Sequence, residues 1–313
     1  MPSDLSVIIV TFNVREMTID CLQSLYAAQP EGVSMEVLVV DNASSDDTVQ
    51  AVQARFPDLK WILNSSNKGF AAANNQALRM ASGEFILLLN PDTVVKPGAI
   101  EILLDFMRKN GKVAVCGPRL VKANGKPQHS VLPFPSALEN LLRCTGLDRL
   151  IYAHKRDAFY WRNQPFTADY LTGACLMLRR AAIEGEFLFD ERFFMYAEEM
   201  DLCLRLHRRG WQVYFVPAAE VIHFGGQSAQ SIPVDSFIMK QRSLILFFHK
   251  HYSFARATLL SLTWGMSLSA TWLAFAALRP FSRDEHGRMV AGNRASLFKA
   301  ATQWYWSHWL SVT

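Results

Sequence analysis

Short apolar segments alternate with amphipathic helical patterns through the first third of the chain, and this alternation constrains the fold more than any other feature. Because strands joined by helices form right-handed crossovers, it predicts an α/β fold with a mainly parallel sheet flanked by helices. Ligands of such sheets bind beyond the carboxyl ends of the strands. The five predicted strands cover residues 5–10, 37–40, 61–63, 85–89 and 113–116.

The composition narrows the class of protein. The chain has 313 residues, half of them apolar, which suffices for one extended domain or two closely packed ones. A net charge of +4 without a long basic stripe argues against nucleic acid as a partner. Five cysteines without a C-x-x-C pair favour reduced thiols over disulfides or a zinc site. The start of the sequence lacks the positive residues of a signal peptide, so we expect the N-terminal part in the cytoplasm.

Polar residues follow four of the predicted strands, at the point where each strand ends. Any one of these groups alone is better explained as a turn or a helix cap. Four of them at one sheet edge favour a ligand site. No G-x-G-x-x-G or G-x-x-x-x-G-K-[ST] pattern is present, which argues against a dinucleotide fold and a P-loop. The four groups are Thr11-Phe12-Asn13, Asp41-Asn42, residues 64–67 and Asn90-Pro91-Asp92.

Seven segments of this chain resemble, in order, the signatures of family 2 glycosyltransferases of the GT-A fold, above all its rhamnosyltransferase-type members. The resemblance covers residues 5–250. It implies a GT-A catalytic domain over residues 1–250, with a donor half over 1–118 and an acceptor half over 119–250. The segments are SVIIVTFN, VVDNASSDDT, NKGFAAANN, LLLNPDTVV, LTGACLMLRR, FFMYAEEMDLCLRLHRRGW and VIHFGGQS.

The resemblance also implies donor-binding and metal-binding residues. Asp92 stands at the family's D-x-D position and would ligate Mg²⁺ or Mn²⁺, and His223 would be a further ligand of the cation or the diphosphate. A hard cation stabilises the charge that gathers on a diphosphate leaving group. Asn90 replaces the family's first acid, which leaves Asp92 as the main carboxylate. The resemblance implies Thr11, Phe12 and Asp41 as donor-binding residues. Gly69 allows the backbone to approach the donor, and Lys68 is a candidate that is better explained as a solvated loop lysine. Asn13, Asn42 and Asn90 are further donor-binding candidates.

The catalytic base is expected in the stretch Glu198-Glu199-Met200-Asp201, which resembles the family's E-D-x-D signature. Glu199 takes the base position, and Glu198 is the alternative. Acids in a first helical turn are also explained by the helix dipole alone. Asp201 lies about 200° around the helix from Glu199 and is expected to cap the helix or pair with an arginine.

The acceptor side of the site rests on the same resemblance. Thr172 and Gly173 match a family segment that lines the acceptor pocket, and Asp169 is a candidate to join them. One carboxylate base and one in-line displacement imply inversion at the anomeric carbon.

Residues 251–313 are predicted to form a membrane-associating helical tail. Residues 257–278 carry no charge and are long enough to span a bilayer. The basic residues that follow argue against a single span from a cytoplasmic domain. Residues 294–310 are amphipathic, which favours a monotopic anchor on the cytoplasmic leaflet. A true span is the second alternative, and an ordinary packed helix or dimer contact is the third.

These observations combine into one expected function. We expect an inverting, metal-dependent glycosyltransferase at the cytoplasmic face of the cell membrane, which moves rhamnose from dTDP-rhamnose onto a polyprenyl-linked or cell-surface glycan. One alternative uses a UDP-hexose donor on the same fold. Another is a non-catalytic scaffold that binds a nucleotide sugar. The sequence leaves the linkage, the acceptor and a homo-oligomeric state open.

Overall fold

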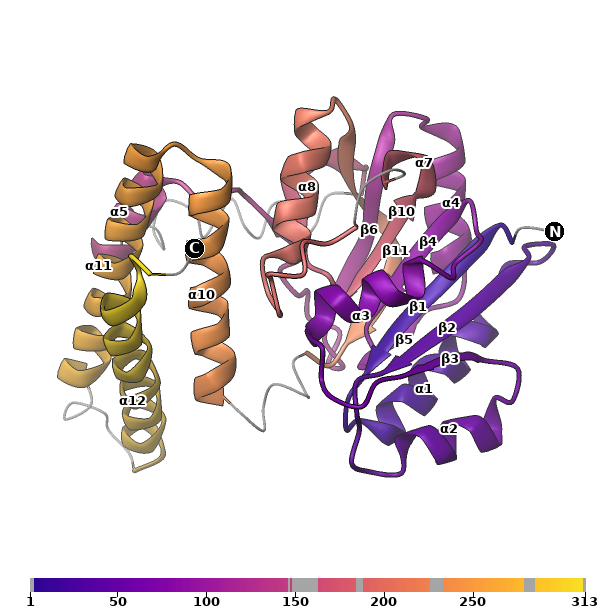
Figure 1. The fold of residues 1–313 in the computed structure, drawn as a ribbon, viewed down its shortest axis with the longest axis horizontal. Coiled ribbons are helices and arrows are strands. Elements are labelled where there is room, and N and C mark those ends of the chain that lie inside the picture. Colours follow the sequence, from indigo (N-terminus) through magenta and orange to yellow (C-terminus); the bar gives the residue numbers. More distant parts are fainter. Residues whose placement is uncertain are drawn as a thin grey trace. The chain divides into compact units, whose positions relative to one another are not determined.

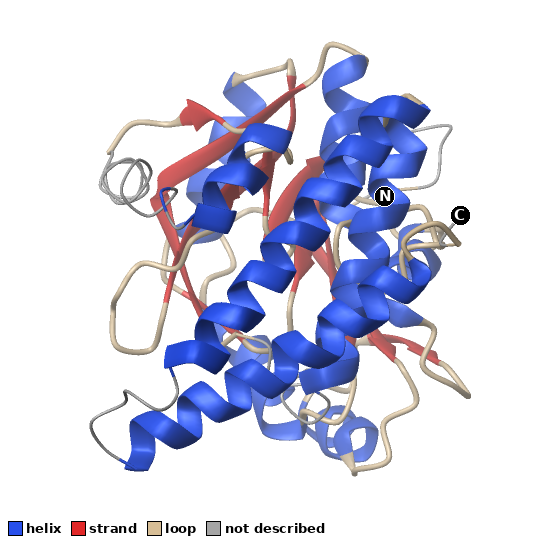
Figure 2. Ribbon diagram, turned by 90° about the vertical axis from the view of Figure 1, so that its left-hand side faces the viewer, coloured by secondary structure: helices blue, strands red, loops and turns tan. Residues whose placement is uncertain are grey.

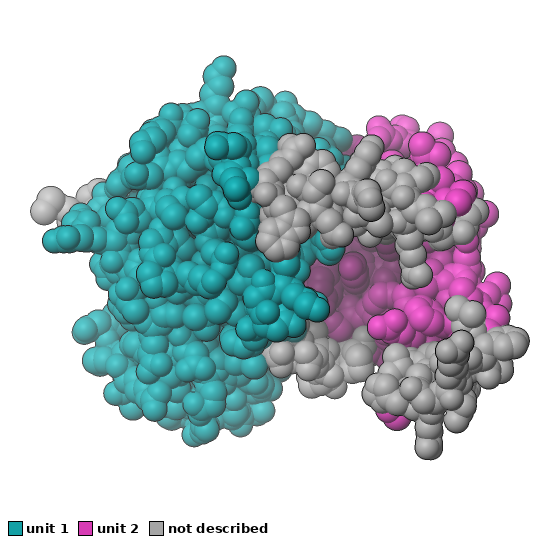
Figure 3. Space-filling model, turned by 180° about the vertical axis from the view of Figure 1, so that it is seen from behind, with its two compact units in different colours: residues 1–134, 159–194, 198–228 teal, residues 135–158, 195–197, 229–313 magenta. Residues whose placement is uncertain are grey.

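The computed structural model describes residues 3–145, 147, 163–183, 188–225, 233–278 and 285–311. The chain forms two compact units (Figure 3). Unit 1 comprises residues 1–134, 159–194 and 198–228, and unit 2 comprises residues 135–158, 195–197 and 229–313.

Unit 1 is built on a nine-stranded sheet with the order β3-β2-β1-β4-β10-β6-β11-β5, to which β8 adds by pairing with β11 (Figure 1). Two further short strands, β7 (Val131–Leu132) and β9 (Tyr170–Leu171), pair with each other. The strands of the large sheet are β1 (Leu5–Thr11), β2 (Met35–Asp41), β3 (Lys60–Leu63), β4 (Phe85–Leu89), β5 (Thr93–Val95), β6 (Val113–Val121), β8 (Phe166–Thr167), β10 (Cys175–Arg179) and β11 (Gln212–His223).

The sheet confirms the α/β fold and all five predicted strands. Strands β3, β2, β1 and β4 run parallel, as do β6 and β11. Strand β10 lies antiparallel between β4 and β6, a place that the strand–helix alternation does not predict. Strand β5 pairs antiparallel with the end of β11.

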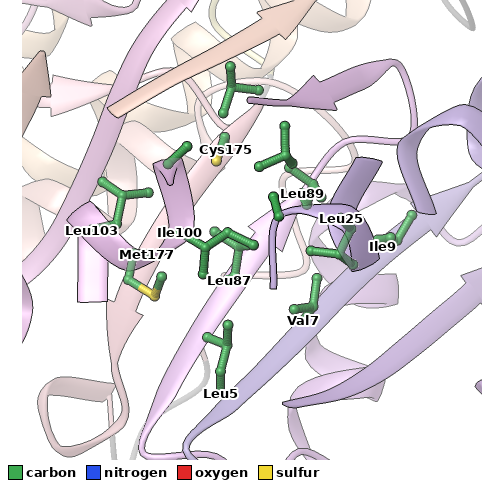
Figure 4. Close-up of a cluster of buried hydrophobic side chains, with 14 of the residues drawn as sticks. Leu5, Val7, Ile9, Leu25, Leu87, Leu89, Ile100, Leu103, Cys175 and Met177 are labelled. Carbon is green, nitrogen blue, oxygen red and sulfur yellow. The ribbon is translucent and has the colours of Figure 1, made fainter. Parts of the chain in front are cut away.

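Helices cover both faces of this sheet (Figure 1), whose strands are red in Figure 2. Alternate residues of β1 point to opposite faces, so Leu5, Val7 and Ile9 join one apolar core and Ile8 joins the other. Figure 4 shows the first core, where these side chains meet strand β4 and helices α1 and α4. The first face is covered by α1 (Arg15–Ala27), α2 (Thr48–Arg55) and α4 (Ala99–Lys109), and the second by α3 (Gly69–Leu78), α7 (Arg180–Ile183) and α8 (Glu198–Arg208).

A buried carboxylate, Glu36, lies at the amino end of β2 and is fully hydrogen-bonded. Ser6 Oγ donates to Glu36 Oε1 over 2.6 Å, and Lys60 Nζ donates to Oε2 over 2.6 Å. Both the N–H and the hydroxyl of Ser82 donate to Oε1 as well. Burial alone raises the pKa of Glu36, but the hydrogen bonds from Lys60, Ser6 and Ser82 outweigh it and lower the pKa to about 2.

Unit 2 is helical and has a core of its own. Ile245, Leu268 and Tyr305 are buried there, with partly buried aromatic residues around them. The aromatic side of α12, which the sequence suggested for the membrane interface, instead faces this core, because Phe298 and Trp304 pack against it. The helices are α5 (Ala137–Thr145), α10 (Pro233–His251), α11 (Phe254–Leu278) and α12 (Glu285–His308).

Helix α11 buries several small or polar side chains beside Leu260 and Leu268, and it exposes several large apolar ones. Ser261, Thr263, Gly265 and Ser267 are buried. A Cβ on Gly265 would lie 2.6 Å from the Trp306 ring, so the glycine allows α11 and α12 to approach closely. The exposed side carries Leu259, Leu262, Met266 and Leu273. Inward-facing small and polar residues at close helix contacts are typical of helices that pack in lipid.

Within the described part of the chain, α11 is the one helix long and apolar enough to cross a membrane, over Phe254–Ala277. The contacts place α10 with α11 and α12. A domain boundary near residue 250 stays a prediction.

Candidate active site

The polar residues after β1, β2 and β3 lie side by side, as expected for the carboxyl ends of parallel strands. Thr11 pairs in register with Asp41, and the Asn42 N–H donates to the Thr11 carbonyl over 2.9 Å. The Asn64 N–H donates to the Asp41 carbonyl over 2.9 Å. The sheet therefore brings three of the predicted polar groups to one edge.

Asp41 is buried at this edge with half of its carboxylate unused. Its Oδ2 accepts from the Ser44 N–H over 3.0 Å. Its Oδ1 is buried and has no hydrogen-bond partner. A buried acceptor without a donor costs free energy, which a ligand N–H or O–H group would recover.

The neighbouring residues after β1 are held by local hydrogen bonds. Thr11 Oγ1 lies 2.8 Å from Thr18 Oγ1, so this hydroxyl is used inside the protein. Asn13 has a left-handed φ of 53°, and its N–H donates to Ser44 Oγ over 2.9 Å. Phe12 is half-buried between them. The two loops that follow β1 and β2 thus form one connected wall.

Asn42 joins this wall to the loop before α3. Its Nδ2 donates to the Gly69 carbonyl over 3.1 Å, and its Oδ1 accepts from the N–H of the exposed Lys68 over 3.3 Å. Gly69 has a φ of +81°, and a Cβ there would lie 2.3 Å from the Phe194 carbonyl oxygen. The Phe70 N–H donates to that same carbonyl over 2.7 Å. Only glycine allows this close approach between the loop and the segment before α8.

Asp92 and His223 are brought together by strand pairing. His223 pairs in register with Thr93, and the Phe224 N–H donates to the Asp92 carbonyl over 3.0 Å. Thr93 Oγ1 donates to the Asn90 carbonyl over 2.7 Å and closes the turn. The two side chains predicted as metal ligands are therefore neighbours. The last three residues of the VIHFGGQS segment lie outside the described residues.

The geometry of this pair fits a shared divalent cation. His223 Nε2 lies 3.3 Å from Asp92 Oδ1, yet this buried nitrogen makes no hydrogen bond. Two ligands at right angles, each about 2.1 Å from one Mg²⁺, lie about 3 Å apart. No group of three His, Cys, Asp or Glu side chains suited to a metal occurs among the described residues. The pair could thus supply two ligands, with phosphate oxygens and water completing the shell.

The three acids at the start of α8 have different surroundings. Glu198 is buried, and this burial, reinforced by the charges of Glu199 and Asp201, raises its pKa well above the usual range. Asp201 is fully buried and accepts from Arg205 Nε over 2.9 Å, which confirms the expected pairing with an arginine. Glu199 is half-buried.

The backbone that leads into α8 is unusual. Tyr196 and Ala197 both have left-handed φ angles, of 72° and 65°. Non-glycine residues in this conformation cost free energy and often cluster at functional sites.

The predicted acceptor residues divide into two places. The Asn90 N–H donates to the Ala174 carbonyl over 2.9 Å, so Thr172 and Gly173 lie close to the Asn90 turn. Thr172 Oγ1 is buried without a hydrogen-bond partner. Asp169 lies elsewhere, because its carbonyl is 2.9 Å from His207 Nε2 in the last turn of α8, about 13 Å along the helix from Glu198.

Gln128 is a residue of this region that no sequence pattern singled out. Its Oε1 lies 3.0 Å from His223 Nδ1, the ring nitrogen that faces away from Asp92. It stands outside every segment of the family resemblance, and only the folded chain reveals the contact.

Comparison with known proteins gives a consistent picture at the sequence level. The family described as "Glycosyl transferase family 2" matches residues 6–187. The N-acetylglucosaminyl-diphospho-decaprenol L-rhamnosyltransferase of Mycobacterium tuberculosis is 30% identical over 319 residues, which cover 93% of this chain and 99% of that protein. Rhamnosyltransferase WbbL of Escherichia coli K12 is 26% identical over 206 residues, 63% of this chain and 75% of that protein.

A solved structure is also similar. The mannosyltransferase PcManGT of Pyrobaculum calidifontis, solved with GDP-Man and Mn²⁺, superposes with a TM-score of 0.59 at 19% identity. The match covers 98% of this chain and 88% of that one, and it supports the expected GT-A type of fold.

Proposed function

The chain belongs to glycosyltransferase family 2, and from this premise we propose that it transfers rhamnose from dTDP-rhamnose to a polyprenyl-diphosphate-linked sugar at the cytoplasmic face of the membrane. The observation that carries the proposal is the pair of buried Asp92 and half-buried His223 at the carboxyl edge of the sheet. The proposed sugar and acceptor class follow the name of the mycobacterial relative.

The donor nucleotide is proposed to lie against the wall formed by the loops after β1 and β2. Asp41 Oδ1 is the buried acceptor that a base N–H or a ribose hydroxyl would satisfy. The loop at Lys68 and Gly69 closes the other side, and α3 begins there with its positive end. Thr11, Phe12, Asn13, Asn42 and Asn90 complete the proposed donor site.

Asp92 and His223 are proposed to hold Mg²⁺ or Mn²⁺ together with the diphosphate. A bound cation would neutralise the charge that develops on the departing diphosphate. In support, the unbonded Nε2 of His223 faces the Asp92 carboxylate at a spacing that suits two ligands of one ion. The pairing of β5 with β11 brings the two side chains together, because His223 pairs with Thr93, the neighbour of Asp92.

Glu199 is proposed as the base. The acceptor hydroxyl oxygen forms a bond to the anomeric carbon, the bond from that carbon to the diphosphate breaks, and the hydroxyl proton passes to the Glu199 carboxylate. Attack opposite the leaving group inverts the configuration. Glu198 is the poorer candidate, since burial and the charge of Glu199 raise its pKa and so favour the protonated form, which cannot take up a proton. Thr172 and Gly173, beside the Asn90 turn, are proposed to contact the acceptor.

Helix α11 supports the proposed membrane association. Its exposed side carries Leu259, Leu262, Met266 and Leu273, while its small or polar residues Ser261, Thr263, Gly265 and Ser267 are buried. This arrangement leaves apolar area where lipid would cover it. A protein held at the membrane would meet an acceptor that carries a polyprenyl chain.

A donor panel tests the proposed substrates. Full-length protein in nanodiscs is given dTDP-rhamnose, UDP-GlcNAc, UDP-galactose or GDP-mannose with Mn²⁺, and a polyprenyl-diphosphate GlcNAc acceptor. We expect transfer from dTDP-rhamnose to exceed transfer from the others by about 10² or more. Preferred use of a UDP-hexose would establish the alternative donor, and binding without transfer or donor hydrolysis would favour the non-catalytic scaffold.

A second experiment tests the membrane surface. Deleting α11 and α12 would break the core that they share with α10, so exposed positions are the better targets. The double variant Leu262→Gln/Met266→Gln should float with liposomes less than wild type, and Leu63→Gln, at an exposed leucine of β3, serves as the matched control. Wild-type protein that stays unbound in the presence of liposomes would contradict membrane association.

A further inference from the structure

Gln128 lies behind the proposed metal ligand His223 and is fixed in place by its own backbone. Its N–H donates to the Leu120 carbonyl over 2.9 Å, just after the bridge between Val121 and Pro127. Leu120 belongs to β6, the parallel neighbour of β11, which carries His223. The side chain thus reaches His223 from a segment that folds back onto the adjacent strand, and its Oε1 lies 3.0 Å from Nδ1.

This contact bears on which ring nitrogen of His223 carries the hydrogen. A neutral imidazole has one N–H and one lone pair, and the partner of one nitrogen determines the state of the other. An amide oxygen only accepts, so Gln128 Oε1 favours the hydrogen on Nδ1. The lone pair then sits on Nε2, 3.3 Å from the Asp92 carboxylate, where no hydrogen bond is made. A lone pair facing a carboxylate oxygen is unfavourable unless a cation lies between them.

We propose that Gln128 is the positioning residue of the metal site, which holds the His223 ring with Nδ1–H toward itself and with the Nε2 lone pair toward the cation shared with Asp92. The inference rests on the proposed metal-dependent function. Outer partners of this kind orient metal-bound histidines and typically contribute 10–100-fold to metal affinity.

Because the Gln128 amide is uncharged, substitutions by Glu and by Met should have different effects on Mn²⁺ affinity. Gln128 orients the ring without adding negative charge, whereas a carboxylate in its place would orient the ring and also make it more basic. Gln128→Glu should therefore keep Mn²⁺ affinity at or above that of wild type. Gln128→Met has a similar length but no strong acceptor, so it should lose the orientation.

Mn²⁺ binding to the full-length protein, followed by EPR in the presence of dTDP, tests this directly. We expect Gln128→Met to weaken Mn²⁺ binding by about 10–100-fold, and Gln128→Glu to restore it. The matched control is Gln29→Met, because Gln29 bonds the Val33 carbonyl beyond the end of α1, away from the metal pair. Thermal unfolding of each variant separates loss of the site from loss of the fold.

The ring itself provides a second reading. Nitrogen NMR of labelled protein with Mg²⁺ and dTDP, with His223→Ala to assign the signal, should show the hydrogen on Nδ1 in wild type and a mixture of tautomers in Gln128→Met. Hydrogen on Nε2 in wild type would overturn the proposed role of Gln128, and so would unchanged Mn²⁺ affinity in Gln128→Met. Wild-type protein that binds no Mn²⁺ would overturn the metal site as well.

Discussion

Two carboxylates on one strand, β2, have opposite surroundings. Glu36, at the amino end, accepts hydrogen bonds from two serines and a lysine, and its pKa is lowered to about 2. Asp41, at the carboxyl end, has one buried oxygen that accepts nothing. The same strand thus has a fully bonded acid at one edge of the sheet and an incompletely bonded one at the other.

The difference distinguishes acids that stabilise the fold from acids whose oxygens are available to bind a ligand. Natural proteins satisfy nearly all buried polar groups, so the exceptions need an explanation. Three of the exceptions in the described part of the chain, at Asp41, His223 and Glu198, lie at the carboxyl edge and the start of α8. Glu198 is also the acid whose pKa moves in the direction opposite to that of Glu36. Variants at the two edges should therefore change different quantities.

The largest effect is expected for Glu199→Gln. The amide keeps the shape of the side chain but accepts no proton, so the single-turnover transfer rate should fall by about 10² to 10⁴ while donor affinity barely changes. Rapid-quench transfer and donor titration measure the two quantities. Asp201→Asn is the control, because it loosens the pair with Arg205 and should lower stability more than the rate. If Glu198→Gln is inactive and Glu199→Gln turns over like wild type, Glu198 is the base.

Glu36→Gln should mainly destabilise the fold. Weakening charged hydrogen bonds to the serines and Lys60 should lower the free energy of unfolding by about 2 kcal/mol at neutral pH. Because the folded pKa lies below the unfolded value of about 4.3, the stabilisation is present above that value and is lost as the pH falls toward 2. Urea unfolding at several pH values should show wild type and variant converging in acid. An equal difference at all pH values would contradict the role of the ionised carboxylate.

Asp41→Asn should mainly weaken donor binding. The carboxylate is expected to bind the donor through its free oxygen, and its loss should reduce affinity by about tenfold, or about 1.4 kcal/mol. Stability should change by less, since that oxygen has no partner to lose. Calorimetric titration with dTDP measures the affinity, and urea unfolding measures the stability. If Asp41→Asn lost as much stability as Glu36→Gln, the claim that Asp41 serves ligand binding and Glu36 serves stability would be contradicted.

Glu198→Gln is expected to give the smallest effect. It should raise the free energy of unfolding, whereas Glu36→Gln should lower it. The folded pKa of Glu198 is raised, so wild type loses stability as the pH rises from the unfolded value of about 4.3 toward the folded pKa. The amide does not ionise and should be more stable than wild type above this range, with little difference near pH 4. A variant less stable than wild type at pH 8 would show that Glu198 has a structural partner like that of Glu36.

Much of this molecule could be predicted from its sequence, because short periodic patterns determine it. The five strands and the polar edge follow from apolar runs and the residues that end them. The pairing of Asp201 with Arg205 follows from helical spacing. These features depend on neighbours within a few residues along the chain.

The features that escaped prediction depend on contacts between distant residues. Strand β10 enters the sheet antiparallel to β4, about 90 residues away in the chain, which no local pattern encodes. Gln128 meets His223 only because β6 and β11 pair. The aromatic side of α12 looked like an interface helix from its periodicity, and its packing into the core of unit 2 could not be known from that helix alone.

The central claim is that the carboxyl edge of the sheet binds a nucleoside diphosphate through a cation held by Asp92 and His223. Calorimetric titration of the full-length protein with dTDP tests it most directly, with Mn²⁺, with EDTA, and with Asp92→Asn and Glu36→Gln. We predict that binding requires Mn²⁺, that Asp92→Asn weakens it by about tenfold or more, and that folded Glu36→Gln binds like wild type. Equal affinity for dTDP in Mn²⁺ and in EDTA, or in wild type and Asp92→Asn, would contradict the account.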